Sequence, residues 1–211
     1  MSMRLPAEQR RRQLLDVSLD VFAERGFHAT SMDDVALAAG VTKPVLYQHF
    51  PNKRGLFTEL LDDVGHQLLV ELIAATSSAS NGREQVERGF EAYFTFVGRR
   101  PAAFRLLFGA SVRNDPDFAV VADRVVDEAS NAISALIVIE GSDAHRDVLA
   151  HALVGIAEAV ARYALTDGEP LHDSEQLARW VSQMTWSGLR GVTPDEHVRA
   201  AELGRSGPSG V

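Results

Sequence analysis

The sequence has no cysteine among its 211 residues, which excludes disulfides, thiol redox sensing and cysteine-ligated zinc. No stretch approaches the roughly 18 apolar residues that a membrane-spanning helix needs, and the polar, basic start has no signal-peptide core. The sequence also has no Gly-rich phosphate loop, no Gly-x-Ser-x-Gly elbow and no His-Glu-x-x-His pair. We therefore expect a cytoplasmic, non-membrane protein that is not an enzyme and needs no metal or cofactor.

Positive charge is scarce overall but concentrated near the N-terminus. The chain holds 21 Lys and Arg against 29 Asp and Glu, a net charge of −8. Residues 1–54 hold eight basic and six acidic residues, so they carry +2 and the remainder carries −10. An acidic body with a basic head would orient on DNA and limit non-specific binding. Taken alone, the four arginines Arg4, Arg10, Arg11 and Arg12 fit a solvated terminal segment equally well.

Residues 31–50, SMDDVALAAGVTKPVLYQHF, predict two short helices joined by a tight turn. Ser31 and Asp34 have the Ser-x-x-acid spacing of a capping box at the start of the first helix. Gly40 follows that helix where the backbone needs a residue that tolerates positive φ. Thr42 can cap the second helix, whose first turn contains Pro44.

The second helix of this segment is barely two turns long, so it cannot be stable alone. Leu46 and Phe50 can hold it against its neighbours. The side chains left facing outward are those of Thr42, Lys43, Tyr47, Gln48 and His49. Hydroxyls, a cation, an amide and an imidazole on a short braced helix suit a reader of the DNA major groove. On spacing alone, an ordinary helical hairpin is an equally good interpretation.

Two longer runs carry a family resemblance: RRRQLLDVSLDVFAERGFHATSM and AGVTKPVLYQHFPNK. Over roughly residues 8–68 they resemble the N-terminal domain of the TetR family of bacterial regulators. Gly55 departs from the pattern, because the family usually has a helix-favouring acid there. The resemblance implies an all-α protein with a three-helix helix-turn-helix head and a C-terminal helical domain for ligand binding and dimerisation. It also implies a ligand-responsive regulator, expected to be a repressor that binds a near-palindromic operator as a homodimer.

The candidate contacts to double-stranded DNA are Arg10, Ser31, Thr42, Lys43, Pro44, Val45, Tyr47, Gln48, His49 and Lys53. The hydroxyls of Ser31 and Thr42 can hold phosphates beside helix-start N–H groups. Lys43 can reach guanine acceptors, and Gln48 can pair with adenine. The apolar side chains of Pro44 and Val45 can touch a thymine methyl. The resemblance implies contacts to the DNA backbone by Tyr47, His49 and Lys53.

After this head, apolar residues recur at helical spacing to about residue 190. One long helix carries Leu56 to Leu72 and is expected to belong to both halves of the chain. The predicted organisation is a DNA-binding domain at 8–68, a ligand-binding and dimerisation domain at 69–192 and a flexible tail at 193–211.

Two C-terminal helices, near 148–164 and 177–189, are apolar over more than one face. A helix that is apolar all round must be buried all round, and small residues let another helix approach closely. In the family these helices build a four-helix dimer bundle, although an internal core is the alternative. The expected interface residues are Gly155, Ile156, Ala159, Tyr163, Leu177, Val181 and Met184. A dimer would space its two heads ~34–36 Å apart on successive major-groove turns.

Aromatic residues crowd the segment between residues 90 and 118. They can form an ordinary core or, collectively, an apolar pocket for a small molecule. The candidate pocket residues are Phe90, Tyr93, Phe94, Phe104, Phe108 and His151. The recognition segment and the Leu153-Val154-Gly155 run are similar to actinobacterial fatty-acid-synthesis regulators of this family, so the expected effector is an acyl chain. The competing class is a helical lipid carrier that does not bind DNA.

Overall fold

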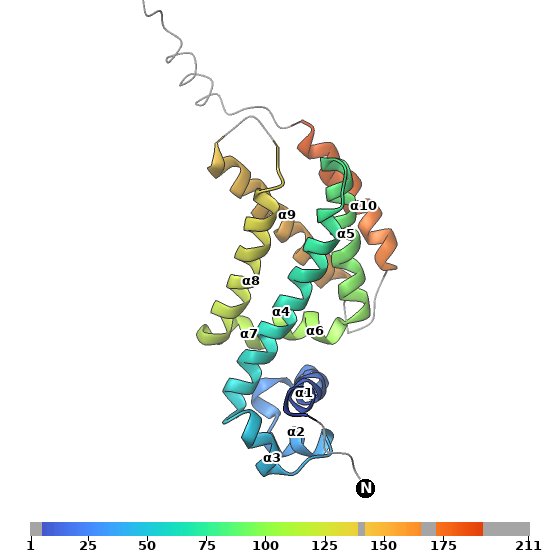
Figure 1. Ribbon diagram of the computed structural model, residues 1–211. Coiled ribbons are helices and arrows are strands. Elements are labelled where there is room, and N and C mark those ends of the chain that lie inside the picture. The colour runs from blue at the N-terminus through green and yellow to red at the C-terminus, as the bar shows by residue number, and fades with distance from the viewer. Residues whose placement is uncertain (1–5, 139–141, 166–171, 192–211) are drawn as a thin grey trace, which may run out of the picture. The chain divides into compact units, whose positions relative to one another are not determined.

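A computed structural model describes residues 6–138, 142–165 and 172–191, and these residues form helices and connecting turns, with no strand among them (Figure 1). The all-α expectation is confirmed, and no helix in the described ranges is long and apolar enough to cross a membrane. The expected tail at 193–211 lies outside the described residues. In chain order the helices are α1 (Ala7–Ala29), α2 (Met32–Ala38), α3 (Lys43–His49), α4 (Lys53–Ser77), α5 (Gly82–Arg99), α6 (Pro101–Phe108), α7 (Ala110–Arg113), α8 (Pro116–Ser134), α9 (Asp143–Ala164) and α10 (Ser174–Leu189).

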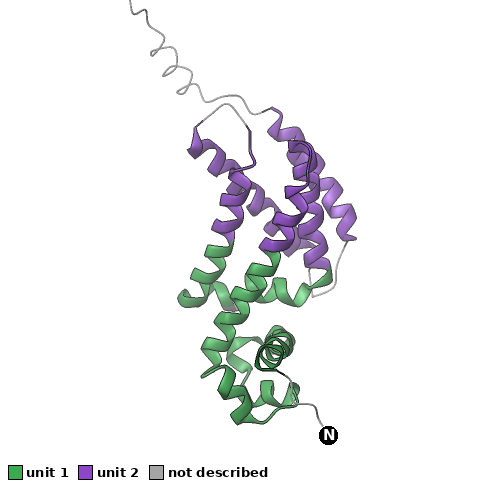
Figure 2. Cartoon of the chain, in the orientation of Figure 1, with its two compact units in different colours: residues 1–68, 99–125 green, residues 69–98, 126–211 purple. Residues whose placement is uncertain are grey.

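The chain divides into two compact units (Figure 2). The first unit comprises residues 1–68 and 99–125, and the second comprises 69–98 and 126–211. The helices α6 and α7 and the first part of α8 are therefore grouped with the N-terminal helices, which the predicted domain at 8–68 did not include. Both α4 and α8 run from one unit into the other without a break.

Helix α1 is broken at Gly26. Gly26 has φ 76° and ψ 167°, a left-handed backbone that favours glycine. The Thr30 hydroxyl donates to the Gly26 carbonyl at 2.8 Å, which satisfies an acceptor left by the break. The break turns Phe27 into the core of the first unit, where Leu14 and Phe22 are also buried.

Four phenylalanines form the aromatic core of this unit. Phe57 of α4 lies 4.9 Å from both Phe22 and Phe27, and Phe118 of α8 lies 4.7 Å from Phe57 and 4.8 Å from Phe27, measured between ring centroids. Pairs in this range contribute about 0.5–1.5 kcal/mol each beyond the burial of their area. The start of α4 is thereby fixed against α1 and the first turn of α8.

In the second unit α5 lies beside α10, and α8 lies beside α9 (Figure 1). The Ser134 hydroxyl of α8 donates to Asp147 of α9 at 2.7 Å. Helix α8 ends at Ser134. The N–H groups of Leu136 and Ile137 bond carbonyls three residues back, a tighter turn that closes the helix after Ser134.

Candidate DNA-binding site

The capping box predicted at the start of α2 is present. The Ser31 N–H donates to Asp34 Oδ2 at 2.8 Å, and the Asp34 N–H donates to Ser31 Oγ at 3.2 Å. The hydroxyl and the N–H of Ser31 lower the pKa of Asp34, with a further contribution from Arg25. Asp34 thus stays ionised and keeps α2 capped, while Ser31 Oγ already has an internal partner.

The turn into α3 depends on Gly40, whose φ is 63°. The Val41 N–H donates to the Ala36 carbonyl at 3.0 Å, so the end of α2 is closed by a backbone bond. Thr42 occupies the N-cap position of α3, but its hydroxyl makes no capping bond. That hydroxyl remains available for another acceptor or donor.

Helix α3 is held by two fully buried side chains, Leu46 and Phe50. Arg11 supports its end, because the guanidinium donates to the His49 carbonyl at 2.7 Å and lies 4.4 Å from the centroid of the Phe50 ring. Of the five side chains predicted to face outward, those of Thr42, Lys43, Tyr47 and Gln48 are exposed in the structure, whereas that of His49 is not fully exposed; Pro44 is exposed as well. Val45 and His49 are half-buried.

Nearly all the described cations of residues 6–54 already have internal partners. Arg11 pairs with Glu59, Arg12 with Asp16 and Asp63, Arg25 with Asp34, Lys43 with Asp33 and Arg54 with Asp115. Arg10 donates to the Gln13 side chain at 2.7 Å. Counting charges along the sequence therefore overstates the positive charge that is free to meet phosphates. Only Asp16 lies at the local i,i+4 spacing from its partner Arg12. The other carboxylates lie farther away along the chain, as far as Asp115, so the local sequence does not indicate them.

Lys53, expected to contact DNA, is anchored within the first unit. Its ammonium donates at 2.8 Å to the carbonyls of both Phe27 and Thr30, with a longer contact to His28 at 3.4 Å. It also lies 4.4 Å from the centroid of the Phe27 ring. An ammonium has three donors, so these carbonyls can occupy all of them. The structure therefore gives Lys53 an internal task at the α1–α2 junction.

The candidate dimer residues divide by exposure. Gly155, Ala159, Tyr163 and Met184 are exposed, and Ile156 is half-buried. An added Cβ at Gly155 would meet nothing within 4 Å. Two residues expected at the interface, Leu177 and Val181, are instead buried on the inner face of α10. The exposed face of α9 therefore carries small residues, Gly155 and Ala159, that do not pack against another part of the second unit that the structure describes.

The candidate pocket residues fall into both units. Phe90, Tyr93 and Phe94 are buried on α5 in the second unit, whereas Phe104 and Phe108 lie on α6 in the first. The exposed ring of His151 contacts the Asp147 carbonyl at 2.9 Å through Nδ1, and Asp127 lies 3.6 Å from Nε2.

The hydroxyl of Tyr93 stands out within this set. It is buried and has no hydrogen-bond partner among the described residues. Burial raises the pKa of Tyr93 far above its ordinary value, with a further contribution from the negative charge of Glu158. The hydroxyl therefore stays protonated and can act as a neutral donor.

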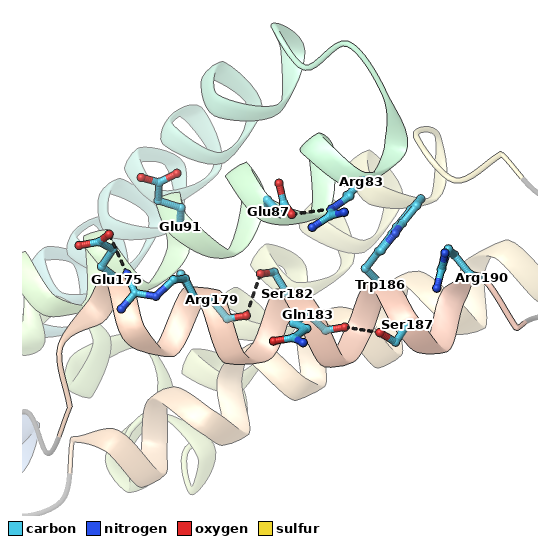
Figure 3. A pocket seen from close by; sticks show the side chains of 11 residues that line it. Arg83, Glu87, Glu91, Glu175, Arg179, Ser182, Gln183, Trp186, Ser187 and Arg190 are labelled. Carbon is cyan, nitrogen blue, oxygen red and sulfur yellow. Dashed lines mark hydrogen bonds and ion pairs between the residues drawn. The ribbon is translucent and has the colours of Figure 1, made fainter.

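A groove of about 600 Å³ lies between α5 and α10 in the second unit (Figure 3). Most of its lining residues are charged or polar: Arg83, Glu87, Glu91, Glu175, Ala178, Arg179, Ser182, Gln183, Trp186, Ser187 and Arg190. Two of the arginines are paired, since Arg83 Nε lies 2.8 Å from Glu87 and Arg179 lies 2.7 Å from Glu175. None of the candidate pocket residues lines this groove, which differs from the apolar pocket expected.

Comparison with known proteins agrees with this architecture. Residues 14–60 match the family model described as bacterial regulatory proteins, tetR family, and residues 83–188 match that of the tetracyclin repressor-like C-terminal domain. The chain is 34% identical over 191 residues to the HTH-type transcriptional activator FasR of Mycolicibacterium smegmatis, covering 90% of this chain and 87% of FasR. The protein belongs to the TetR family of DNA-binding transcriptional regulators, as the sequence resemblance predicted.

Solved structures show the same fold. A TetR-like transcriptional regulator from Rhodococcus sp. RHA1 superimposes with a TM-score of 0.68 at 29% identity, covering 90% of this chain and all of the other. FadR from Bacillus subtilis in complex with stearoyl-CoA superimposes with a TM-score of 0.73 at 17% identity, covering 84% and 98%. At the latter identity the likeness concerns the fold alone.

Replacing Lys53 with Met tests its internal role. Met keeps most of the apolar stem but removes the charged donor from two carbonyls, so the free energy of unfolding should fall by about 1–3 kcal/mol. Urea denaturation followed by circular dichroism measures this. The matched control is Arg10→Met, expected to change stability by about 0.5 kcal/mol or less. Equal midpoints for the two variants would contradict the anchoring role.

Proposed function

We propose that this protein is a homodimeric, ligand-controlled transcriptional regulator that reads a near-palindromic operator through α3. The observation that carries the proposal is the braced presentation of α3. Leu46 and Phe50 are buried, while the hydroxyl, amide and phenol of Thr42, Gln48 and Tyr47 face outward. A rigid short helix with polar outer residues is the arrangement that major-groove reading needs.

The contacts to DNA divide into two kinds. Thr42, whose hydroxyl makes no capping bond, holds a phosphate at the start of α3. Gln48 and Lys43 read base edges, and the exposed Pro44 and half-buried Val45 can meet a thymine methyl. Tyr47, His49, Ser31, Arg10 and Lys53 position the head on the backbone. Ser31 would do so while keeping its capping bond, whereas Lys53 would have to release one of its carbonyl partners to donate to a phosphate.

Dimerisation joins two such heads. The exposed face of α9 carries Val148, Gly155, Ala159 and Tyr163 at helical spacing, and Met184 is exposed on α10. The open space above Gly155 permits a close approach by another helix. Apolar and small residues of this kind, left uncovered in one chain, support an isologous interface between two copies.

The effector is proposed to be an apolar molecule with one polar acceptor. Phe90 and Phe94 supply apolar lining on α5, and Tyr93 supplies a buried, protonated hydroxyl. The relative named FadR was solved with stearoyl-CoA, which supports an acyl chain as the first candidate. A regulator of this kind acts where the chromosome lies, so we place it in the cytoplasm.

The direction of regulation stays a prediction. The family resemblance favours repression, whereas the Mycolicibacterium smegmatis relative is named a transcriptional activator. A ligand shifts the equilibrium toward whichever conformation it binds better, so either sign follows from the same architecture. The family assignment disfavours the alternative of a lipid carrier without DNA binding.

Base reading by Gln48 is tested with Gln48→Ala. Loss of its bidentate amide should relax the sequence preference at one operator position, at a cost of about 1–3 kcal/mol in discrimination. Selection of binding sites from random duplexes, followed by sequencing, measures the preference. Gln183→Ala in α10 is the control and should leave the profile unchanged. An unaltered profile for Gln48→Ala would refute its role.

The dimer interface is tested with Tyr163→Glu combined with Met184→Glu. Four carboxylates facing one another across the interface should leave a species of 23.0 kDa in sedimentation, whereas the native chain should sediment at twice that mass. Operator binding should weaken in parallel. Val120→Glu, at another exposed apolar position, is the control and should remain dimeric. A native chain that sediments as a monomer at micromolar concentration would overturn the dimer.

The effector is tested by extracting small molecules that co-purify with the protein and identifying them by mass spectrometry. Titration of the recovered compound should show that Tyr93→Phe weakens its binding about tenfold, because its acceptor loses a donor. Stability of the ligand-free protein should not fall, since the hydroxyl has no internal partner. The exposed Tyr163→Phe is the control. Equal affinities for the two variants would exclude Tyr93 from recognition.

A further inference from the structure

The first residue of α3 is clamped by the first turn of α2. Lys43 Nζ lies 2.9 Å from Asp33 Oδ1 and 3.0 Å from Asp33 Oδ2, so the carboxylate holds the ammonium with both oxygens. Hydrogen bonding to Asp33, with its negative charge, raises the pKa of Lys43. Both side chains are more than half exposed. The pair is therefore accessible to an incoming duplex.

The neighbouring acids Asp33 and Asp34 have separate tasks. Asp34 completes the capping box and pairs with Arg25, so it builds the fold. Asp33 meets Lys43 and takes no part in the cap. A change at Asp33 can therefore alter the charge beside the recognition helix without removing the cap of α2.

We propose that Asp33 is a specificity-determining residue, which holds Lys43 away from any duplex that lacks acceptors at the matching base edge. This inference rests on the proposed reading of DNA by α3. On an operator, the ammonium exchanges Asp33 for guanine acceptors, and the carboxylate can accept from the amino group of a neighbouring cytosine. On other sequences, Lys43 stays with Asp33, whose carboxylate neutralises the ammonium.

This arrangement acts mainly on unwanted binding. Non-specific affinity comes from cations that neutralise phosphates and release counterions. A lysine that is already neutralised by its own chain adds little to this non-specific affinity. Random duplexes are therefore bound less tightly than they would be by a free lysine. Discrimination is the difference between the affinity for the operator and the affinity for other sequences. Weakening the binding of other sequences therefore increases discrimination as much as strengthening the binding of the operator.

The experiment measures binding of Asp33→Asn to a 30-base-pair duplex of random sequence and to a duplex selected by the native protein, across a series of salt concentrations. A freed Lys43 gains about one phosphate contact per engaged head. The slope of log affinity against log salt for the random duplex should then steepen by ~0.9 per head, which is about eightfold tighter binding at ~0.1 M salt. The selected duplex should gain less, so the specificity ratio falls.

Two controls separate the mechanism from a general change in charge. Asp20→Asn removes one exposed acid of α1 that has no ion pair with the described residues, and it should leave the slope unchanged. On a Lys43→Ala background, Asp33→Asn should bring no further gain for the random duplex. A gain that persists there, or a slope equal to that of Asp20→Asn, overturns the proposal. If the native protein bound neither duplex, the proposed function itself would fail.

Discussion

The burial of Leu46 and Phe50 is the constraint on which the DNA-binding unit depends. Helix α3 has seven residues, too few to persist on its own hydrogen bonds. Its conformation is imposed by those two side chains, by the turn at Gly40 and by Arg11, which bonds the last carbonyl of the helix. The polar side chains on the outer face of α3 are held in place only because its inner face is fixed.

Most positive charges of the first unit are also bound within the unit. Most described cations of residues 6–54 are bound by carboxylates or carbonyls of the same chain, as in Arg54 with Asp115 and Lys53 with Phe27. Exposed ion pairs such as Arg54 with Asp115 contribute little stability each, unlike the carbonyl contacts of Lys53. Their greater effect is on recognition, because a paired cation must exchange partners before it can meet a phosphate. If α3 reads DNA as proposed, association is then more selective than the local charge suggests.

The sequence predicted most of the local structure, because its signals are local. Ser31 and Asp34, three residues apart, predict the cap of α2, Gly40 predicts a positive φ, and the apolar residues of the second helix place Leu46 inward. Long-range partners could not be predicted in this way. Nothing near Lys53 in the chain indicates that its ammonium is bound by carbonyls more than twenty residues earlier. The grouping of α6 with α1 likewise depends on packing.

The separation of tasks within α3 has an evolutionary consequence. Thr42 and Gln48 face outward and support no part of the fold that the structure describes, whereas Leu46 and Phe50 point inward and support it. Substitutions at the outer positions can thus accumulate with little penalty in stability. A duplicated gene could acquire a new target sequence in a few steps without passing through an unfolded intermediate. Lys43 is the exception, because a change there also orphans Asp33.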